Sequence, residues 1–255
     1  MKETLYTIPL MDAFHEGEEC AFCSIERKSE QDALDYILGS AAAYMQVDIR
    51  EVTDKIGFCR DHFKKMFQYG NALGNAIMLS SYYHKVNTQL AKRMNSPLAK
   101  KTKLFKRKAD NEDESQAEVG ISSWIRDREE ECQICGRFKE TYARYLDTFF
   151  MMLKDEEFYK TVMSSKGFCL HHYADIMDGI ERKLGGRLKE DAIKDINKLM
   201  KENMDRVEED LAWFIQKFDY RYRDADWKNS RDALQRAMQK IGGGFPADSW
   251  YVSKK

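Results

Sequence analysis

The chain has 255 residues, of which 43% are hydrophobic and 33% charged, and its formal net charge is −1. This composition is typical of a folded, helix-rich protein and excludes a disordered one. The near-neutral charge disfavours nucleic acid or a membrane surface as the main partner, and no apolar run approaches the ~18 residues of a spanning helix. The first ten residues lack the apolar core of a signal peptide, so we expect a cytoplasmic protein with reduced thiols.

Apolar residues at helical spacing predict an all-α fold along the whole chain. In the first half, the pattern predicts a helix over 24–45, a short helix or turn over 48–56, and one long helix over 61–94. The stripe of the first helix comprises Leu34, Ile37, Leu38, Ala41 and Met45. The stripe expected to be buried on the long helix comprises Phe63, Met66, Phe67, Gly70, Leu73 and Ile77.

The second half predicts the same order of helices. Segments 137–153, 173–184 and 188–218 have helical periodicity, with a short segment around Phe158 and Val162 after the first of them. A final amphipathic helix over 227–241 should present Trp227, Leu234, Ala237, Met238 and Ile241. The predicted domains are therefore a first helical repeat (1–95), a charged linker (96–120), a second repeat (121–225) and a C-terminal helix with its tail (226–255).

All six cysteines belong to a Cys/His pattern that occurs twice. In each copy a Cys-x-x-Cys pair is followed by Cys-x-x-His, after 35 residues in the first copy and 33 in the second. A Glu-Glu pair precedes each Cys-x-x-Cys, and each Cys-x-x-His begins as Gly-Phe-Cys. The candidate ligands are Cys20, Cys23, Cys59 and His62 in the first copy, and Cys132, Cys135, Cys169 and His172 in the second.

Three thiolates and one imidazole satisfy the preference of Zn²⁺ for four tetrahedral ligands. Positions i and i+3 share one face of a helix, so His172, three residues after Cys169, can bind the same ion, whereas His171 points elsewhere. We therefore expect two zinc ions per chain, one within each repeat, each joining the starts of two helices at one end of a bundle. An iron–sulfur cluster is the alternative occupant of such ligands.

Catalytic interpretations are weaker than a structural one. A catalytic zinc keeps one coordination position open, whereas each copy of the pattern offers four protein ligands. The sequence therefore does not decide whether the chain is an enzyme, but it favours a protein without enzymatic activity. The glutamates before each Cys-x-x-Cys are expected to be solvated carboxylates. A thiol–disulfide exchange site would leave Cys59 and His62 without a role, and His15 and His84 have no partner at ligand spacing.

The segment Thr7–Phe14 leading into Cys20-x-x-Cys23, the Gly-Phe-Cys-x-x-His motif and the segment Asp232–Ala237 resemble a functionally uncharacterised family of bacterial, clostridial-type proteins. The resemblance covers most of the chain outside the charged linker. It implies a bacterial cytoplasmic setting and no particular reaction.

The sequence thus favours a zinc-binding helical scaffold or protein-interaction module with an unidentified protein partner. The second hypothesis is an iron–sulfur redox protein or an accessory to a redox enzyme. The third is a nucleic-acid-binding regulator that uses the basic part of the linker, although an acidic block follows at once. The basic residues are Lys100, Lys101, Lys103, Lys106, Arg107 and Lys108.

Overall fold

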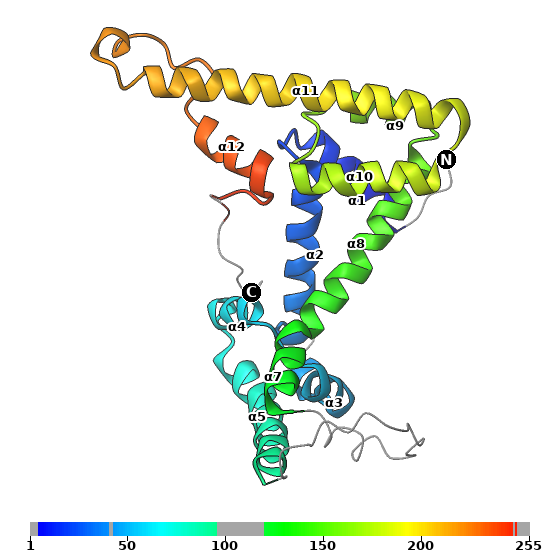
Figure 1. Ribbon diagram of the computed structural model, residues 1–255, viewed down its shortest axis with the longest axis vertical. Helices are drawn as coiled ribbons and strands as arrows, with labels where there is room; N and C mark the ends of the chain where they lie inside the picture. The colour runs from blue at the N-terminus through cyan, green and yellow to red at the C-terminus, as the bar shows by residue number, and fades with distance from the viewer. Residues whose placement is uncertain (1–4, 41–42, 96–119, 247, 249–255) are drawn as a thin grey trace. The chain divides into compact units, whose positions relative to one another are not determined.

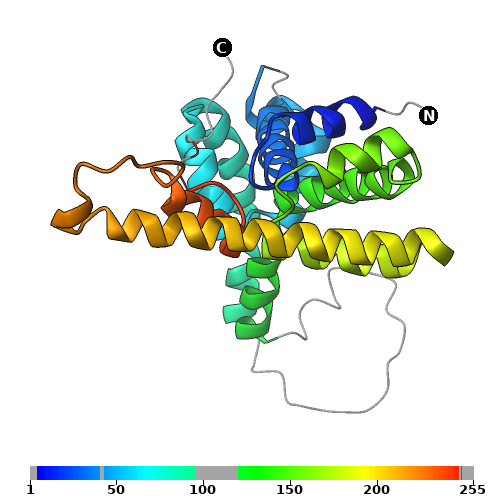
Figure 2. The ribbon, with the colours of Figure 1, turned by 90° about the horizontal axis from the view of Figure 1, so that it is seen from above.

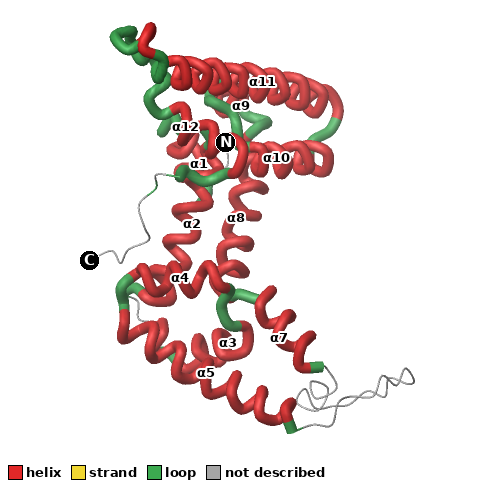
Figure 3. The backbone as a smooth tube through the Cα atoms, turned by 60° about the vertical axis from the view of Figure 1, so that its left-hand side comes forward, coloured by secondary structure: helices red, strands yellow, loops and turns green. Residues whose placement is uncertain are grey.

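The computed structural model describes residues 5–40, 43–95, 120–246 and 248. The described residues form helices and loops without any strand, so the predicted all-α fold is confirmed (Figure 3). The first half contains α1 (Thr7–His15), α2 (Ala21–Leu38), the 3₁₀ helix η1 (Ala43–Met45), α3 (Val47–Ile56), α4 (Arg60–Tyr69) and α5 (Ala72–Met94). The second half contains α7 (Ile121–Glu130), α8 (Gln133–Met152), α9 (Glu156–Met163), α10 (Leu170–Lys183), α11 (Gly186–Gln216), the 3₁₀ helix η3 (Tyr220–Tyr222) and α12 (Ala233–Gly242). Across these described ranges, no helix is long and apolar enough to cross a membrane.

The chain divides into two compact units, and each unit takes elements from both halves of the sequence. Unit 1 comprises Met1–Ser29 and Lys139–Ser249, and unit 2 comprises Glu30–Phe138 and Trp250–Lys255. The division falls inside α2 and α8, so each of these helices contributes residues to both units. It therefore differs from the predicted repeat domains 1–95 and 121–225. The predicted linker 96–120 lies outside the described residues except for Gly120.

Unit 1 has an aromatic core to which both halves of the chain contribute. Phe14 and Phe22 come from the first half, and Phe149, Phe158 and Phe168 come from the second. The ring centroids of Phe22 and Phe149 are 5.4 Å apart with a T-shaped geometry, and those of Phe14 and Phe158 are 5.6 Å apart. Such pairs add stability beyond the area they bury. The 31-residue α11 packs along α10 and α12 (Figures 1 and 2).

Unit 2 is built around α5, which packs against α3, α4 and α7. Its buried core includes Leu34, Ile37, Phe58, Met66 and Met78, and it also takes Ile134 and Cys132 from the second half. The carbonyl of Gly57 accepts a hydrogen bond of 3.0 Å from the backbone nitrogen of Gln133. A main-chain contact thus joins the loop before α4 to the start of α8.

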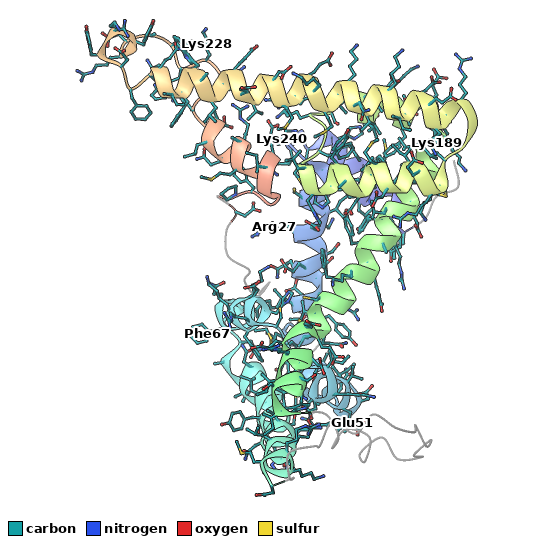
Figure 4. The ribbon with its side chains drawn as sticks, viewed as in Figure 1. Arg27, Glu51, Phe67, Lys189, Lys228 and Lys240 are labelled. Carbon is teal, nitrogen blue, oxygen red and sulfur yellow. The ribbon has the colours of Figure 1, made fainter. Side chains whose placement is uncertain are left out.

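The predicted long helix over 61–94 was wrong, because two helices occupy this segment. Gly70 ends α4 with φ +86°, a left-handed conformation that glycine adopts at little cost. The side chain of Asn71 then caps α5 by accepting from the backbone nitrogen of Gly74 at 2.8 Å. The change in direction leaves Phe67 and Leu73, which we expected to be buried, 85% and 68% exposed, and Phe67 projects from α4 (Figure 4).

Two other predicted helices have different limits in the structure. The helix expected over 24–45 ends at Leu38, and Ala41 lies outside the described residues. The C-terminal helix begins at Ala233, not at 227, because a 3₁₀ turn and loops follow α11. One face of α12 is buried and carries Arg236, Gln239 and Lys240. The predicted apolar residues Leu234, Met238 and Ile241 are exposed.

Candidate metal centres

Each of the four motifs, two Cys-x-x-Cys and two Cys-x-x-His, lies at the start of a helix. Cys20 and Cys132 directly precede α2 and α8, and Cys59 and Cys169 are the N-cap residues of α4 and α10. The N-terminal end of a helix carries a partial positive charge, which stabilises a thiolate. The motif spacing therefore positions sulfur atoms where the backbone favours their charged form.

The repeated Gly-Phe-Cys sequence has a conformational reason. Gly57 and Gly167 have φ values of +80° and +76°, in the left-handed region that favours glycine. A Cβ atom at Gly57 would also lie 2.2 Å from the Tyr82 hydroxyl. The phenylalanines that follow, Phe58 and Phe168, are 3% and 0% exposed and anchor each loop in a core. The glycine thus turns the chain so that the cysteine faces the candidate site.

The structure brings the eight candidate ligands together in two groups, but the groups are not the two sequence copies. Cluster A contains Cys20, Cys23, Cys169 and His172, and cluster B contains Cys59, His62, Cys132 and Cys135. Each Cys-x-x-Cys pair therefore meets the Cys-x-x-His of the other half. The predicted pairing within each repeat was wrong. In each cluster the donor atoms lie within 4.8 Å of one another.

Cluster A lies in unit 1 and is buried. The Nδ1 atom of His172 is 3.1 Å from the Sγ of Cys169, 3.4 Å from that of Cys20 and 3.6 Å from that of Cys23. The sulfur atoms of Cys23 and Cys169 are 3.7 Å apart. All four side chains are at most 5% exposed.

Cluster B lies in unit 2 and has the same arrangement. The Nδ1 atom of His62 is 3.3 Å from each of the three sulfur atoms, and those of Cys59 and Cys135 are 3.9 Å apart. Zinc bond lengths in a tetrahedron imply about 3.8 Å between sulfur atoms and about 3.5 Å between sulfur and nitrogen. The separations in both clusters lie within about 0.4 Å of these values. Cys59 and Cys135 are only partly buried, so cluster B is less enclosed than cluster A.

Both histidines present Nδ1 to the sulfur atoms and Nε2 to a carboxylate on α2. The Nε2 of His172 lies 3.2 Å from Glu26, and that of His62 lies 3.0 Å from Glu30. A carboxylate behind a histidine ligand fixes its tautomer and raises its basicity. His171 lies at the surface, 3.9 Å from Asp175. Glu26, His171 and His172 also lie close enough together to hold a metal ion. Such an ion would have to bind the Nε2 atom of His172, which faces Glu26.

The protonation of these groups reflects the crowding of sulfur and imidazole. Burial by itself lowers the pKa of His62, but hydrogen bonds with Cys132 and Glu30 raise it to about 10. Burial raises the pKa of Cys135 to about 12, with the nearby Cys132 adding to the effect. In cluster A, burial and the neighbouring sulfur atoms raise the pKa of Cys20. Binding of a cation must therefore displace protons from both clusters.

The glycines that follow α12 lie against cluster A. The backbone nitrogen of Gly244 donates to the Sγ of Cys23 at 3.3 Å. The Lys240 side chain, which is 1% exposed, donates to the carbonyl groups of Glu19 and Phe168 at 2.8 and 3.4 Å (Figure 4). Burial lowers the pKa of Lys240, and Glu19 acts in the opposite direction. Lys240 and Gly244 thus lie over cluster A, one as a buried ammonium group and the other as a hydrogen-bond donor to a candidate ligand.

Glu19 was expected to be a solvated carboxylate, and that expectation was wrong. Its side chain is 3% exposed and lies within 4.0 Å of the cationic groups of Arg206, Lys240, Arg236 and Lys166. A buried carboxylate needs such partners, and they come from the second half of the chain. Glu131, at the matching position before Cys132, is exposed. The repeated Glu-Glu sequence therefore has different environments in the two units.

Comparison with known protein families matches residues 1–248 to a family of unknown function, DUF6062. The chain belongs to this family. Comparisons with curated proteins and with solved structures found no significant match. Membership of DUF6062 assigns no activity.

The sequence of this DUF6062 chain predicted the eight candidate ligands but not the carboxylates behind the two histidines. Glu26 follows Cys23 by three residues and so shares its helix face. The residue at the matching position after Cys135 is Phe138, which cannot accept a hydrogen bond. The Nε2 atom of His62 instead contacts Glu30, which lies one turn after Glu26 on α2. Because the acids do not repeat with the motif, the repeat gave no signal for them.

Proposed function

We propose that both clusters bind zinc, two ions per chain, and that the ions are structural. Four protein ligands complete a tetrahedron at each cluster, which leaves no open position for a substrate. The matching sulfur and nitrogen separations carry this proposal. Each ion joins ligands from both halves of the chain, so the metals hold the fold together and the protein acts as a non-enzymatic scaffold.

The spacing of the donors favours a single ion over an iron–sulfur cluster. An iron–sulfur cluster places irons and sulfides between its cysteines, which separates the donor sulfurs that bind different irons. Here sulfur atoms from different motifs lie 3.7 and 3.9 Å apart. That is the separation of two ligands on one ion. Zinc suits such a thiolate-rich tetrahedral site, and a reducing, cytoplasmic compartment would keep the thiolates available.

A role in binding another protein is supported by the outer face of α12. Leu234, Met238 and Ile241 lie at helical spacing and are 43%, 49% and 66% exposed. The opposite face of α12 is held in place by Arg236 and Lys240, so this apolar stripe is presented on an anchored helix. The basic linker segment 100–108, on which a nucleic-acid-binding role would depend, lies outside the described residues.

Elemental analysis combined with a visible spectrum tests the proposal, on full-length protein purified without oxygen. We expect two zinc ions per chain and no colour. Iron with sulfide and a broad visible band would instead establish the redox alternative. Protein that is folded but contains no transition metal would contradict the structural role of the clusters.

A further inference from the structure

A cavity beside cluster B has the size and lining of a small-molecule site. Its volume is about 610 Å³, and it lies in unit 2, between the start of α4, α5 and α7. Four of its lining residues are aromatic: Phe58, Phe63, Tyr82 and Trp124. Ligand pockets typically occupy about 300–1,000 Å³ and are mostly apolar with a few polar groups. The cavity fits this description.

The cavity reaches one of the candidate metal ligands. Cys59 forms part of its wall and is partly exposed. In cluster A the matching residue, Cys169, is 0% exposed, and the glycines after α12 lie against that cluster. The two clusters share a ligand set but differ in access. A molecule in the cavity would touch cluster B, whereas the four side chains of cluster A are at most 5% exposed.

Arg128 supplies the polar group that most restricts the ligand. Its guanidinium lies 5.0 Å from the ring centroid of Tyr82 and 5.4 Å from that of Trp124. One nitrogen donates to the side chain of Gln89 at 3.2 Å, while the buried Nη2 has no acceptor among the described residues. No described carboxylate lies within ion-pair distance of Arg128. A buried guanidinium nitrogen without an acceptor is costly, and an anion would relieve that cost.

A second arginine strengthens the preference for an anion. The guanidinium of Arg93 lies 4.5 Å from the ring centroid of Trp124, and Arg93 is 8% exposed. Burial lowers the pKa of Arg93, and the nearby charge of Arg128 lowers it further. The aromatic walls could attract a cation, but two guanidinium groups already occupy positions on the Trp124 ring. The acidic lining residues, Asp61 and Glu129, are exposed.

We propose that this cavity binds a small aromatic anion, with a ring against Tyr82, Phe63 and Trp124 and its acidic group on Arg128. A carboxylate or sulfonate has the planar or trigonal oxygen arrangement that a guanidinium binds through two hydrogen bonds. The inference rests on the proposed function only in that an ion in cluster B fixes the wall formed by Cys59.

Two fluorescent probes that differ by one charged group test the inference. On zinc-containing full-length protein, 1-anilinonaphthalene-8-sulfonate should bind saturably at one site per chain. N-phenyl-1-naphthylamine, which lacks the sulfonate, should bind more weakly. Arg128→Gln should weaken binding of the sulfonate about tenfold or more, in the range of a lost hydrogen bond to a charged group. It should leave binding of the neutral probe unchanged.

Matched variants separate this site from general surface binding. Arg126→Gln removes an exposed arginine from the same helix, outside the cavity lining, and should leave both affinities unchanged. Val86→Trp fills the cavity and should weaken both probes. Sulfonate binding that is absent, unsaturable or equally affected by Arg128→Gln and Arg126→Gln would overturn the inference. Zinc content, measured on every variant, distinguishes failure of the anion-binding inference from failure of the metal proposal. If Val86→Trp does not fold, the comparison of Arg128→Gln with Arg126→Gln still tests the inference.

Discussion

Removal of the two metal ions is expected to unfold the protein. Structural zinc contributes on the order of 10 kcal/mol per site, whereas the total stability of a folded domain is about 5–15 kcal/mol. Without an ion, each cluster leaves three sulfur atoms and an imidazole within 4.8 Å of one another in a buried or half-buried place. The apolar cores cannot offset the loss of both ions, so the helical signal should fall and the cooperative thermal transition should disappear.

Circular dichroism before and after treatment with a zinc chelator measures this effect, with elemental analysis to confirm that the metal has been removed. Added Zn²⁺ should restore the helical signal and the thermal transition. Added Mg²⁺ should not, because it prefers oxygen ligands. A metal-free protein that keeps its helical signal and its melting temperature would show that the clusters do not support the fold.

The second large effect is expected when the chain is cut between its halves. For this test, a protease site is inserted between Asp113 and Glu114, within the linker predicted from the sequence, and the zinc-containing protein is cut there. Because each cluster takes two ligands from each half, the two fragments should remain together with both ions. The shared aromatic core of unit 1 should hold them further, since Phe14 and Phe22 pack against Phe149 and Phe168. Chelation should then separate the fragments.

Gel filtration of the cut protein, with and without chelator, measures the association. Each fragment prepared alone should bind zinc poorly, and mixing the two with zinc should restore a folded complex. The protein without the inserted protease site, treated with the same protease and chelator, is the control for effects of the reagents. Fragments that each retain one ion and migrate separately would contradict the crossed ligand sets.

Helix content and the role of the motifs could be predicted from the sequence, because both depend on local spacing. The Cys-x-x-Cys pairs precede helices, and Cys59 and Cys169 cap helices, as the pattern indicates. The break at Gly70 was missed because the apolar pattern continues across it. The burial of Arg236 and Lys240 on α12 could not be predicted, because it depends on their ion pairs with the buried carboxylate of Glu19. That requirement involves residues more than 200 positions apart and has no local signature.

The pairing of the motifs could not be predicted because sequence distance is a weak constraint. Cys23 and Cys169 are 146 residues apart, and Cys23 and Cys59 are 36 residues apart. The longer separation corresponds to two doublings of the shorter one, and closing the longer loop therefore costs only about 1.2 kcal/mol more. That cost is small beside the contribution of a structural zinc ion. Helix length favours the crossed pairing instead. The 18-residue α2 is about 27 Å long, and pairing within the first half would require the chain to return over that distance.

The most direct test of the crossed pairing is the zinc content of two double variants, measured by native mass spectrometry. Each variant removes one cysteine from a Cys-x-x-Cys pair and one from a Cys-x-x-His pair. Cys20→Ser with Cys169→Ser disrupts cluster A alone and should leave one zinc ion per chain. Cys20→Ser with Cys59→Ser disrupts both clusters and should leave none. The reverse result, with one ion in the second variant and none in the first, would place each ion within one half of the sequence and contradict the structure.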